Sequence, residues 1–168
     1  SYAPALRRIA EAGYLVVLPS MPLNLAFLSP DKAAKIIKSF PDVMNWVIGG
    51  HSLGGSMAAM YAATHPSQIK GLVLWASYPS SMDNLHDTGL KVLMVFGTQD
   101  GLVSQSELDA ARSLLPVDTF WMPIEGGNHA QFGDYGDQPG DNAATIGAME
   151  QQNIAVKATL EFLSSISK

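Results

Sequence analysis

The stretch Trp46-Val-Ile-Gly-Gly-His-Ser-Leu-Gly-Gly-Ser56 decides the fold of this chain. It contains the pattern G-x-S-x-G at Gly50–Gly54, with an apolar strand-like run before it and a helix-like run after it. In that context the serine occupies a sharp strand-to-helix turn that exposes its hydroxyl and strains its backbone. The pattern therefore predicts that Ser52 is a nucleophile. It also predicts that Gly50 and Gly54 are small because larger side chains would collide across the turn.

The sequence on both sides of this motif alternates between strand and helix patterns. Short apolar runs predict five strands at Tyr14–Leu18, Trp46–Gly49, Leu72–Ala76, Val92–Phe96 and Thr119–Ile124. Helices are predicted at Ala3–Ala12, from an N-cap at Ser29 to Phe40, at Leu53–Thr64, from Ser104 with Glu107 at capping-box spacing to Leu115, and at Glu150–Ile166. The first four strands are nearly unbroken in hydrophobicity, which is typical of strands buried on both faces. The order predicts an α/β fold, a doubly wound and mostly parallel sheet, in a single domain over residues 1–168.

Two further residues complete a candidate catalytic triad with Ser52. Asp100 follows the fourth predicted strand, and His129 lies in the loop after the fifth. The carboxyl ends of parallel strands meet at one edge of a sheet, so these side chains should converge. A serine hydroxyl needs a base, and that base needs an orienting acid; the order Ser, Asp, His fits this arrangement. The N–H of Leu53, at the start of the following helix, is the candidate oxyanion donor.

The same motifs carry a family resemblance. The chain resembles the α/β-hydrolase superfamily in Gly50–Gly55, in Gly97-Thr98-Gln99-Asp100 and in Gly127-Asn128-His129, and the resemblance covers essentially the whole chain. Residues Gly126–Gly140 resemble a bacterial branch of small, lidless enzymes that are carboxylesterase-like or dienelactone-hydrolase-like. The resemblance implies a serine hydrolase that cleaves carboxylic esters through an acyl-enzyme, with thioesters or lactones as variants. The short connection between Trp75 and Lys91 leaves no room for a lid, which favours small or soluble acyl substrates.

The resemblance also implies strands that this sequence does not contain. The superfamily sheet has eight strands, so three are expected before Ser1, together with the loop that supplies the second oxyanion donor. One of them would lie between the strands predicted at Tyr14–Leu18 and Trp46–Gly49. We therefore expect that this chain is not the whole folding unit and that upstream residues insert a strand there. The alternative is that these two strands pair directly.

Residues just beyond the predicted strand ends suggest the substrate pocket. These residues, which would form a mainly apolar wall beside Ser52, are Met21, Tyr78, Leu102 and Val103. The other histidines are weaker candidates for the base: His51 should be turned away by the sharp turn, and His65 and His86 should lie at the surface.

Three acidic residues in the loop after His129 could suggest a cation site. Asp134, Asp137 and Asp141 do not have the spacing of a calcium-binding EF-hand loop, so turn residues are the simpler interpretation. Asp134 is the alternative candidate for a group that touches the His129 loop. The glycines around Ser52 form neither a dinucleotide-binding nor a Walker A pattern. The sequence therefore predicts neither a cofactor nor a metal.

Composition limits the remaining functions. The chain has 168 residues, a net charge of −5 and no cysteine, and 47% of its residues are hydrophobic. No basic run favours nucleic acid, and no apolar run is long enough to span a bilayer. A cytoplasmic location is favoured, although a targeting segment upstream of Ser1 stays open. Because fold does not fix function, a non-catalytic binding protein on the same fold is the alternative to an esterase.

Overall fold

The computed structural model describes residues 2–19 and 32–166. Its strands form one parallel sheet in the order β1 (Val47–His51), β2 (Gly71–Trp75), β3 (Lys91–Gly97) and β4 (Phe120–Ile124). The helices are α1 (Ala3–Glu11), α2 (Lys32–Ser39), α3 (Leu53–Thr64), α4 (Gln105–Ala111) and α5 (Ala148–Ile166), with short 3-10 turns at Arg112–Leu114 and Ala130–Phe132. Each strand pairs with the next one along the chain, so each connection crosses over a face of the sheet.

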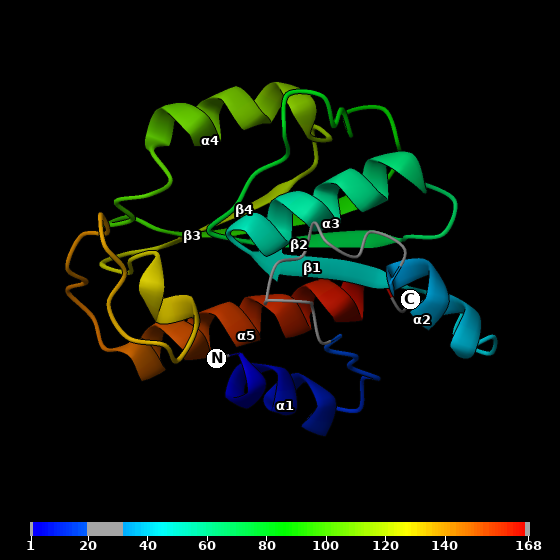
Figure 1. The fold of residues 1–168 in the computed structure, drawn as a ribbon, viewed down its shortest axis with the longest axis horizontal. Helices are drawn as coiled ribbons and strands as arrows, with labels where there is room; N and C mark the ends of the chain where they lie inside the picture. Colours follow the sequence, from blue (N-terminus) through cyan, green and yellow to red (C-terminus); the bar gives the residue numbers. More distant parts are fainter. Residues whose placement is uncertain (1, 20–31, 167–168) are drawn as a thin grey trace.

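Helices cover both faces of this sheet. In Figure 1, α3 and α4 lie above the strands, and α1 and α5 lie side by side below them. The side chains of β2 alternate between two cores: Leu72 and Leu74 pack towards α3 and α4, whereas Val73 and Trp75 pack towards α1 and α5. This two-sided burial explains why the strand sequences are continuously apolar.

The predicted helices and four of the predicted strands are confirmed, with small shifts at their ends. The helix after Ser52 spans Leu53–Thr64 as predicted. The capping box at α4 is present: the Ser104 hydroxyl accepts from the Glu107 N–H, and Glu107 accepts from the Ser104 N–H at 2.8 Å. The predicted continuation to Leu115 is 3-10 rather than α-helical beyond Ala111. The N-cap predicted at Ser29 lies outside the described residues.

The predicted strand at Tyr14–Leu18 is wrong. This segment has no strand pairing, and in the described part of the chain β1 pairs only with β2. A strand is stabilised by hydrogen bonds to a neighbouring strand, and no strand among the described residues supplies them to this segment. Leu15 and Leu18 are consequently more than half exposed, while Tyr14 packs against the core on the α1 and α5 side. Direct pairing of this segment with β1 is therefore not observed. The insertion of a strand between them by upstream residues stays a prediction.

Candidate active site

Ser52 occupies a strained turn between β1 and α3. Its backbone has φ 52° and ψ −129°, a positive φ that is uncommon for a residue with a side chain. The Ser52 N–H donates to the Trp75 carbonyl at 3.0 Å, and the Ser52 carbonyl accepts from the Ser77 hydroxyl at 2.6 Å. Although Ser52 is at the N-cap position of α3, its side chain makes no capping hydrogen bond. The hydroxyl is therefore not used to cap the helix, as serine usually is at this position.

The steric prediction for the glycines is half correct. A Cβ on Gly50 would lie 2.6 Å from the Gly54 carbonyl oxygen and 2.7 Å from the Gly55 nitrogen, so no larger residue fits there. A Cβ on Gly54 would have none of the described atoms within 4 Å, so crowding does not explain Gly54. The crowded position is Gly55, where a Cβ would lie 2.5 Å from the Ser77 hydroxyl oxygen. The reason is that Gly55 is on the buried side of α3, against Ser77, which lies two residues beyond the end of β2.

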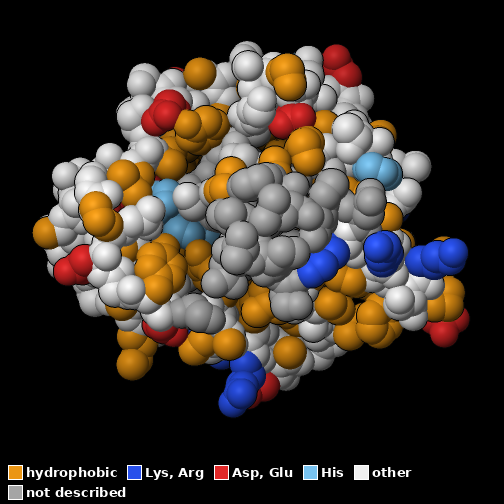
Figure 2. Space-filling view, in the orientation of Figure 1, with side chains coloured by type: hydrophobic (Ala, Val, Ile, Leu, Met, Phe, Trp, Pro, Cys, Tyr) orange, Lys and Arg blue, Asp and Glu red, His pale blue; other side chains and the backbone are white. Residues whose placement is uncertain are grey.

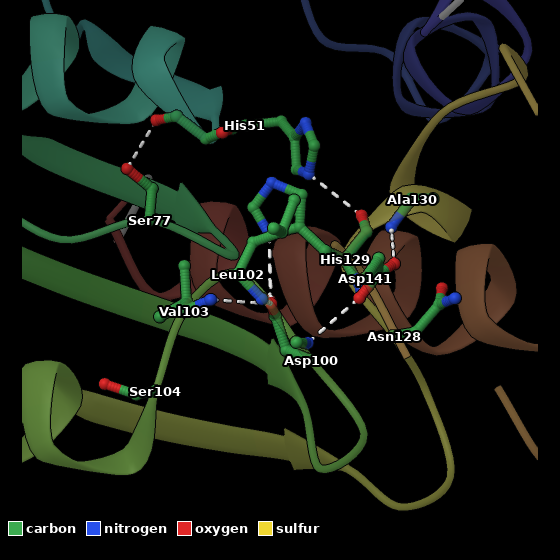
Figure 3. A network of polar contacts seen from close by, with 12 residues as sticks. His51, Ser77, Asp100, Leu102, Val103, Ser104, Asn128, His129, Ala130 and Asp141 are labelled. Atoms are coloured by element: carbon green, nitrogen blue, oxygen red, sulfur yellow. Dashed lines mark hydrogen bonds and ion pairs between the residues drawn. The ribbon is translucent and has the colours of Figure 1, made fainter. Parts of the chain in front are cut away.

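Asp100 and His129 form a buried hydrogen-bonded pair (Figure 3). The His129 Nδ1 lies 2.9 Å from Asp100 Oδ2 and 3.2 Å from Oδ1, and each side chain is only 2% exposed. The Asp100 Oδ1 also accepts from the N–H groups of Leu102 and Val103, both at 2.8 Å, which fixes the carboxylate. A carboxylate only accepts, so the neutral imidazole carries its proton on Nδ1 and has its lone pair on Nε2.

The other ring nitrogen of His129 is available. Nε2 is buried and makes no hydrogen bond to Ser52 or to any other described residue. Most buried polar atoms are paired, so an unpaired ring nitrogen needs an explanation. The ring lies beside the turn that carries Ser52, since its centroid is 4.6 Å from that of His51, the residue that precedes Ser52. The structure thus brings a histidine with a free basic nitrogen next to the strained turn.

His51, which the sequence analysis expects to be turned away by the sharp turn, lies against the His129 ring, and both of its nitrogens are engaged. Its Nε2 donates to the His129 carbonyl at 3.0 Å, and its Nδ1 accepts from the Tyr2 hydroxyl at 2.8 Å. Burial, and after it the neighbouring His129, lower the pKa of His51 to about 4. His51 is therefore neutral at pH 7 and has no free lone pair to act as a base.

Asp141 contacts both candidate catalytic loops, which the sequence analysis did not predict. Its Oδ1 accepts from the N–H of Gly101 at 2.9 Å and of His129 at 3.3 Å, and its Oδ2 accepts from the N–H of Ala130 at 2.8 Å. Asp134, the sequence-based alternative, accepts from Gln152 on α5 instead. Nothing in the spacing of the aspartates distinguishes Asp141, because the contacts depend on how the loop folds back.

Gln151 is a second residue that sequence analysis missed. It is fully buried on α5, and its amide pairs with the backbone of Asn128: the side-chain oxygen accepts from the Asn128 N–H at 3.0 Å, and the side-chain nitrogen donates to the Asn128 carbonyl at 2.7 Å. This clasp fixes the residue before His129. A polar residue on the same helical face as the apolar positions Ala155 and Ala158, one and two turns later, was the signal that could have revealed it.

The predicted pocket residues lie in different environments. Val103 is buried in the core on the α3 and α4 side. Tyr78 is half-buried, and its hydroxyl donates to Glu107, which raises the pKa of Tyr78 to about 12. Leu102 is partly exposed, and Met21 lies outside the described residues. On the face shown in Figure 2, histidine surface lies between groups of hydrophobic side chains. None of the helices in the described part of the chain has the length and apolar character to cross a membrane.

The structure combines three features: a parallel sheet covered by helices, a strained serine after the first described strand, and a buried Asp–His pair beyond the third and fourth strands. Together they define the architecture of an α/β hydrolase. The chain belongs to the Alpha/beta hydrolase family, which it matches over residues 1–153. This confirms the superfamily resemblance of the sequence; the finer bacterial branch stays a prediction.

The chain is similar in sequence to an esterase over part of its length and similar in fold to solved structures over nearly all of it. A stretch of 104 residues is 33% identical to a pimeloyl-[acyl-carrier protein] methyl ester esterase of Citrobacter koseri, covering 60% of this chain and 40% of that protein. An α/β hydrolase from a metagenome of lagoon sediments at Mar Chica, Morocco, has a TM-score of 0.73 at 16% identity, over 99% of this chain and 85% of its own. A monoacylglycerol lipase of Paleococcus ferrophilus has a TM-score of 0.68 at 17% identity, over 98% and 88%. At these identities the two structures support the fold alone.

Proposed function

We propose that this protein is a serine hydrolase of carboxylic esters in which Ser52 is the nucleophile, His129 the general base and Asp100 the acid that orients it. The observation that carries the proposal is the buried His129 ring. Its Nδ1 is fixed by Asp100 at 2.9 Å, and its Nε2 is unpaired beside the turn that holds Ser52. A base needs this combination of a fixed tautomer and a free lone pair.

The proposed reaction begins with proton transfer from the Ser52 hydroxyl to His129 Nε2. The serine oxygen bonds to the ester carbonyl carbon, and the carbonyl oxygen becomes an oxyanion. The C–O bond to the alcohol then breaks, and the leaving alkoxide takes the proton back from His129. Water hydrolyses the acyl-enzyme through the same base. The chemistry requires Ser52 Oγ to come within hydrogen-bonding reach of Nε2 when substrate is bound, as such contacts often tighten only in the complex.

Leu53 is the proposed oxyanion donor of this chain. It is the first residue of α3, so its N–H has no acceptor within the helix. The positive end of the helix dipole favours negative charge at the same point. Its side chain is 48% exposed and can contact a substrate at the surface. A second donor is expected from upstream residues.

The expected substrates are esters with a small or soluble acyl group. The similarity to a methyl ester esterase supports ester chemistry, and the short connection between β2 and β3 leaves little chain for a lid. The predicted pocket contributes the partly exposed Leu102 and the half-buried Tyr78, with Met21 and Val103 as the remaining candidates. The proposed partner is thus a small molecule, without nucleic acid, and no cofactor is needed for this chemistry. A cytoplasmic location stays a proposal.

A panel of p-nitrophenyl esters of graded acyl length tests the function. The wild-type protein, as its organism produces it, should hydrolyse the shorter esters, and Ser52→Ala should lower kcat by at least ~1,000-fold without unfolding. The exposed serine variant Ser106→Ala is the matched control and should keep wild-type turnover. If the protein bound an acyl ester without hydrolysing it, and Ser52→Ala bound the ester equally well, the protein would be a non-catalytic binding protein on the same fold.

A further inference from the structure

We propose that Asp141 is a positioning residue that sets the separation between Asp100 and His129. This inference rests on the proposed function of that pair. Asp141 belongs to neither loop of the triad, yet it accepts hydrogen bonds from both of them (Figure 3). No position in the triad pattern corresponds to it.

The Asp141 carboxylate accepts its hydrogen bonds from backbone N–H groups in the described part of the chain. Its Oδ1 accepts from the N–H groups of Gly101, His129 and its own neighbour Asn142, and its Oδ2 accepts from the N–H of Ala130. Charge-assisted bonds of this kind are stronger than neutral ones. Gly101 directly follows Asp100, so one carboxylate joins the backbone next to the acid with the backbone of the base.

The loop that carries Asp141 lies directly against the Asp100 turn. A Cβ on Gly101 would be 2.6 Å from the Gly140 carbonyl oxygen and 2.7 Å from the Asn142 nitrogen. The two backbones therefore meet without an intervening side chain. Because the contact is this close, a change in the Asp141 hydrogen bonds is transmitted to the position of Gly101 and hence to Asp100.

The geometry that Asp141 controls is narrow. Asp100 Oδ2 and His129 Nδ1 are 2.9 Å apart, and a displacement of about 1 Å at such a pair costs roughly 100-fold in rate. Asp141 does not contact Nε2 or Ser52 in the described structure, so it acts through the pair and not on the substrate. Its loss should consequently change kcat and leave the KM of a small ester nearly unchanged.

The substitution Asp141→Asn tests this role with little change in size. An amide keeps one acceptor oxygen, but its NH2 group cannot accept from the Ala130 N–H or the Gly101 N–H, whichever it faces. We expect kcat for a short p-nitrophenyl ester to fall about 10- to 100-fold, with KM within about 2-fold of wild type. Asp137→Asn, an exposed aspartate in the same loop, is the matched control and should behave as wild type.

The NMR signal of the His129 Nδ1 proton supplies a readout that does not depend on turnover. In the wild type this proton should be protected from exchange by Asp100. In Asp141→Asn the folded protein, verified by its melting temperature, should show the signal shifted upfield or broadened by exchange. An unchanged Nδ1 signal, or a kcat loss no larger than the unfolded fraction, would overturn the proposal. If the wild type hydrolysed no ester, the proposed function would fail, whereas the NMR comparison would still decide the role of Asp141.

Discussion

The Nε2 atom of His51 lies 3.0 Å from the carbonyl oxygen of His129, and the two rings are 4.6 Å apart. The residue before Ser52 is thus hydrogen-bonded to the backbone of His129. This contact joins the β1–α3 turn to the loop after β4. It is possible only while His51 is neutral in one tautomer, with Tyr2 donating to its Nδ1.

The first prediction concerns the pH dependence of stability. The pKa of His51 is about 4 in the folded state against 6.5 for an ordinary histidine, so the unfolded chain binds the proton more tightly. The contribution of neutral His51 to the free energy of unfolding is therefore complete above pH 6.5. It is lost as the pH falls towards 4, which lowers the free energy of unfolding by up to ~3 kcal/mol. Urea unfolding at pH 7 and pH 4.5 should show a smaller loss for His51→Gln than for the wild type. His86→Gln, at an exposed histidine, is the control and should lose as much stability as the wild type. An equal loss of stability in His51→Gln and the wild type would contradict the assignment of the pH dependence to His51.

The second prediction concerns the orienting acid. Asp100→Asn should lower turnover about 10⁴-fold, the size known for the equivalent change in the trypsin-type triad, because an amide neither holds the His129 tautomer nor stabilises the imidazolium. The amide oxygen can still accept from Leu102 and Val103, so the protein should remain folded. Steady-state kinetics and circular dichroism check both parts. Most activity kept in Asp100→Asn but lost in Asp134→Asn would mean that the acid is assigned to the wrong residue.

The third prediction concerns the clasp between α5 and the His129 loop. Gln151→Leu leaves the buried N–H and C=O of Asn128 without partners, and each such group costs roughly 1–3 kcal/mol. The free energy of unfolding in urea should therefore fall by about 2–6 kcal/mol. Gln105→Leu, on the exposed side of α4, should change it by less than about 0.5 kcal/mol. Equal effects of the two substitutions would show that the clasp does not stabilise the fold.

The fourth prediction compares two adjacent glycines. Gly55→Ala places a Cβ 2.5 Å from the Ser77 hydroxyl oxygen and should destabilise the protein by ~1–3 kcal/mol. Gly54→Ala meets none of the described atoms within 4 Å and should be neutral or stabilising by up to ~1 kcal/mol, because alanine favours the helix. Thermal unfolding of both variants measures the difference. A higher melting temperature for Gly55→Ala than for Gly54→Ala would contradict the close contact between Gly55 and Ser77.

The sequence predicted those parts of the structure that depend on local pattern. Nearly continuous apolar runs located β1 to β3, since strands between two helical layers have no polar face to interrupt them, and a further short apolar run located β4. The chain order of Ser52, Asp100 and His129 at the turn and at successive strand ends predicted that Asp100 and His129 would meet. In the structure they do, at 2.9 Å.

The sequence could not predict contacts that depend on neighbours far along the chain. Tyr14–Leu18 has a strand composition, but a strand also requires a partner, and none lies beside it in the described residues. Asp141 and Gln151 bind backbone groups of the loop after β4. Every residue type carries the same backbone carbonyl, and every type but proline the same N–H, so the sequence of the loop does not show that these groups are bound. Gly54 and Gly55 differ only in the side of α3 that they occupy, which becomes visible once the helix is packed on the sheet.

The measurement that tests the central claim most directly is labelling by a fluorophosphonate probe, located by mass spectrometry of the digested protein. The probe reacts with a serine whose hydroxyl is activated by a base. The account predicts one adduct on Ser52, absent in Ser52→Ala, strongly reduced in His129→Gln and unchanged in the control Ser106→Ala. No adduct on Ser52 in the folded protein, or equal labelling after His129→Gln, would contradict a nucleophile activated by His129.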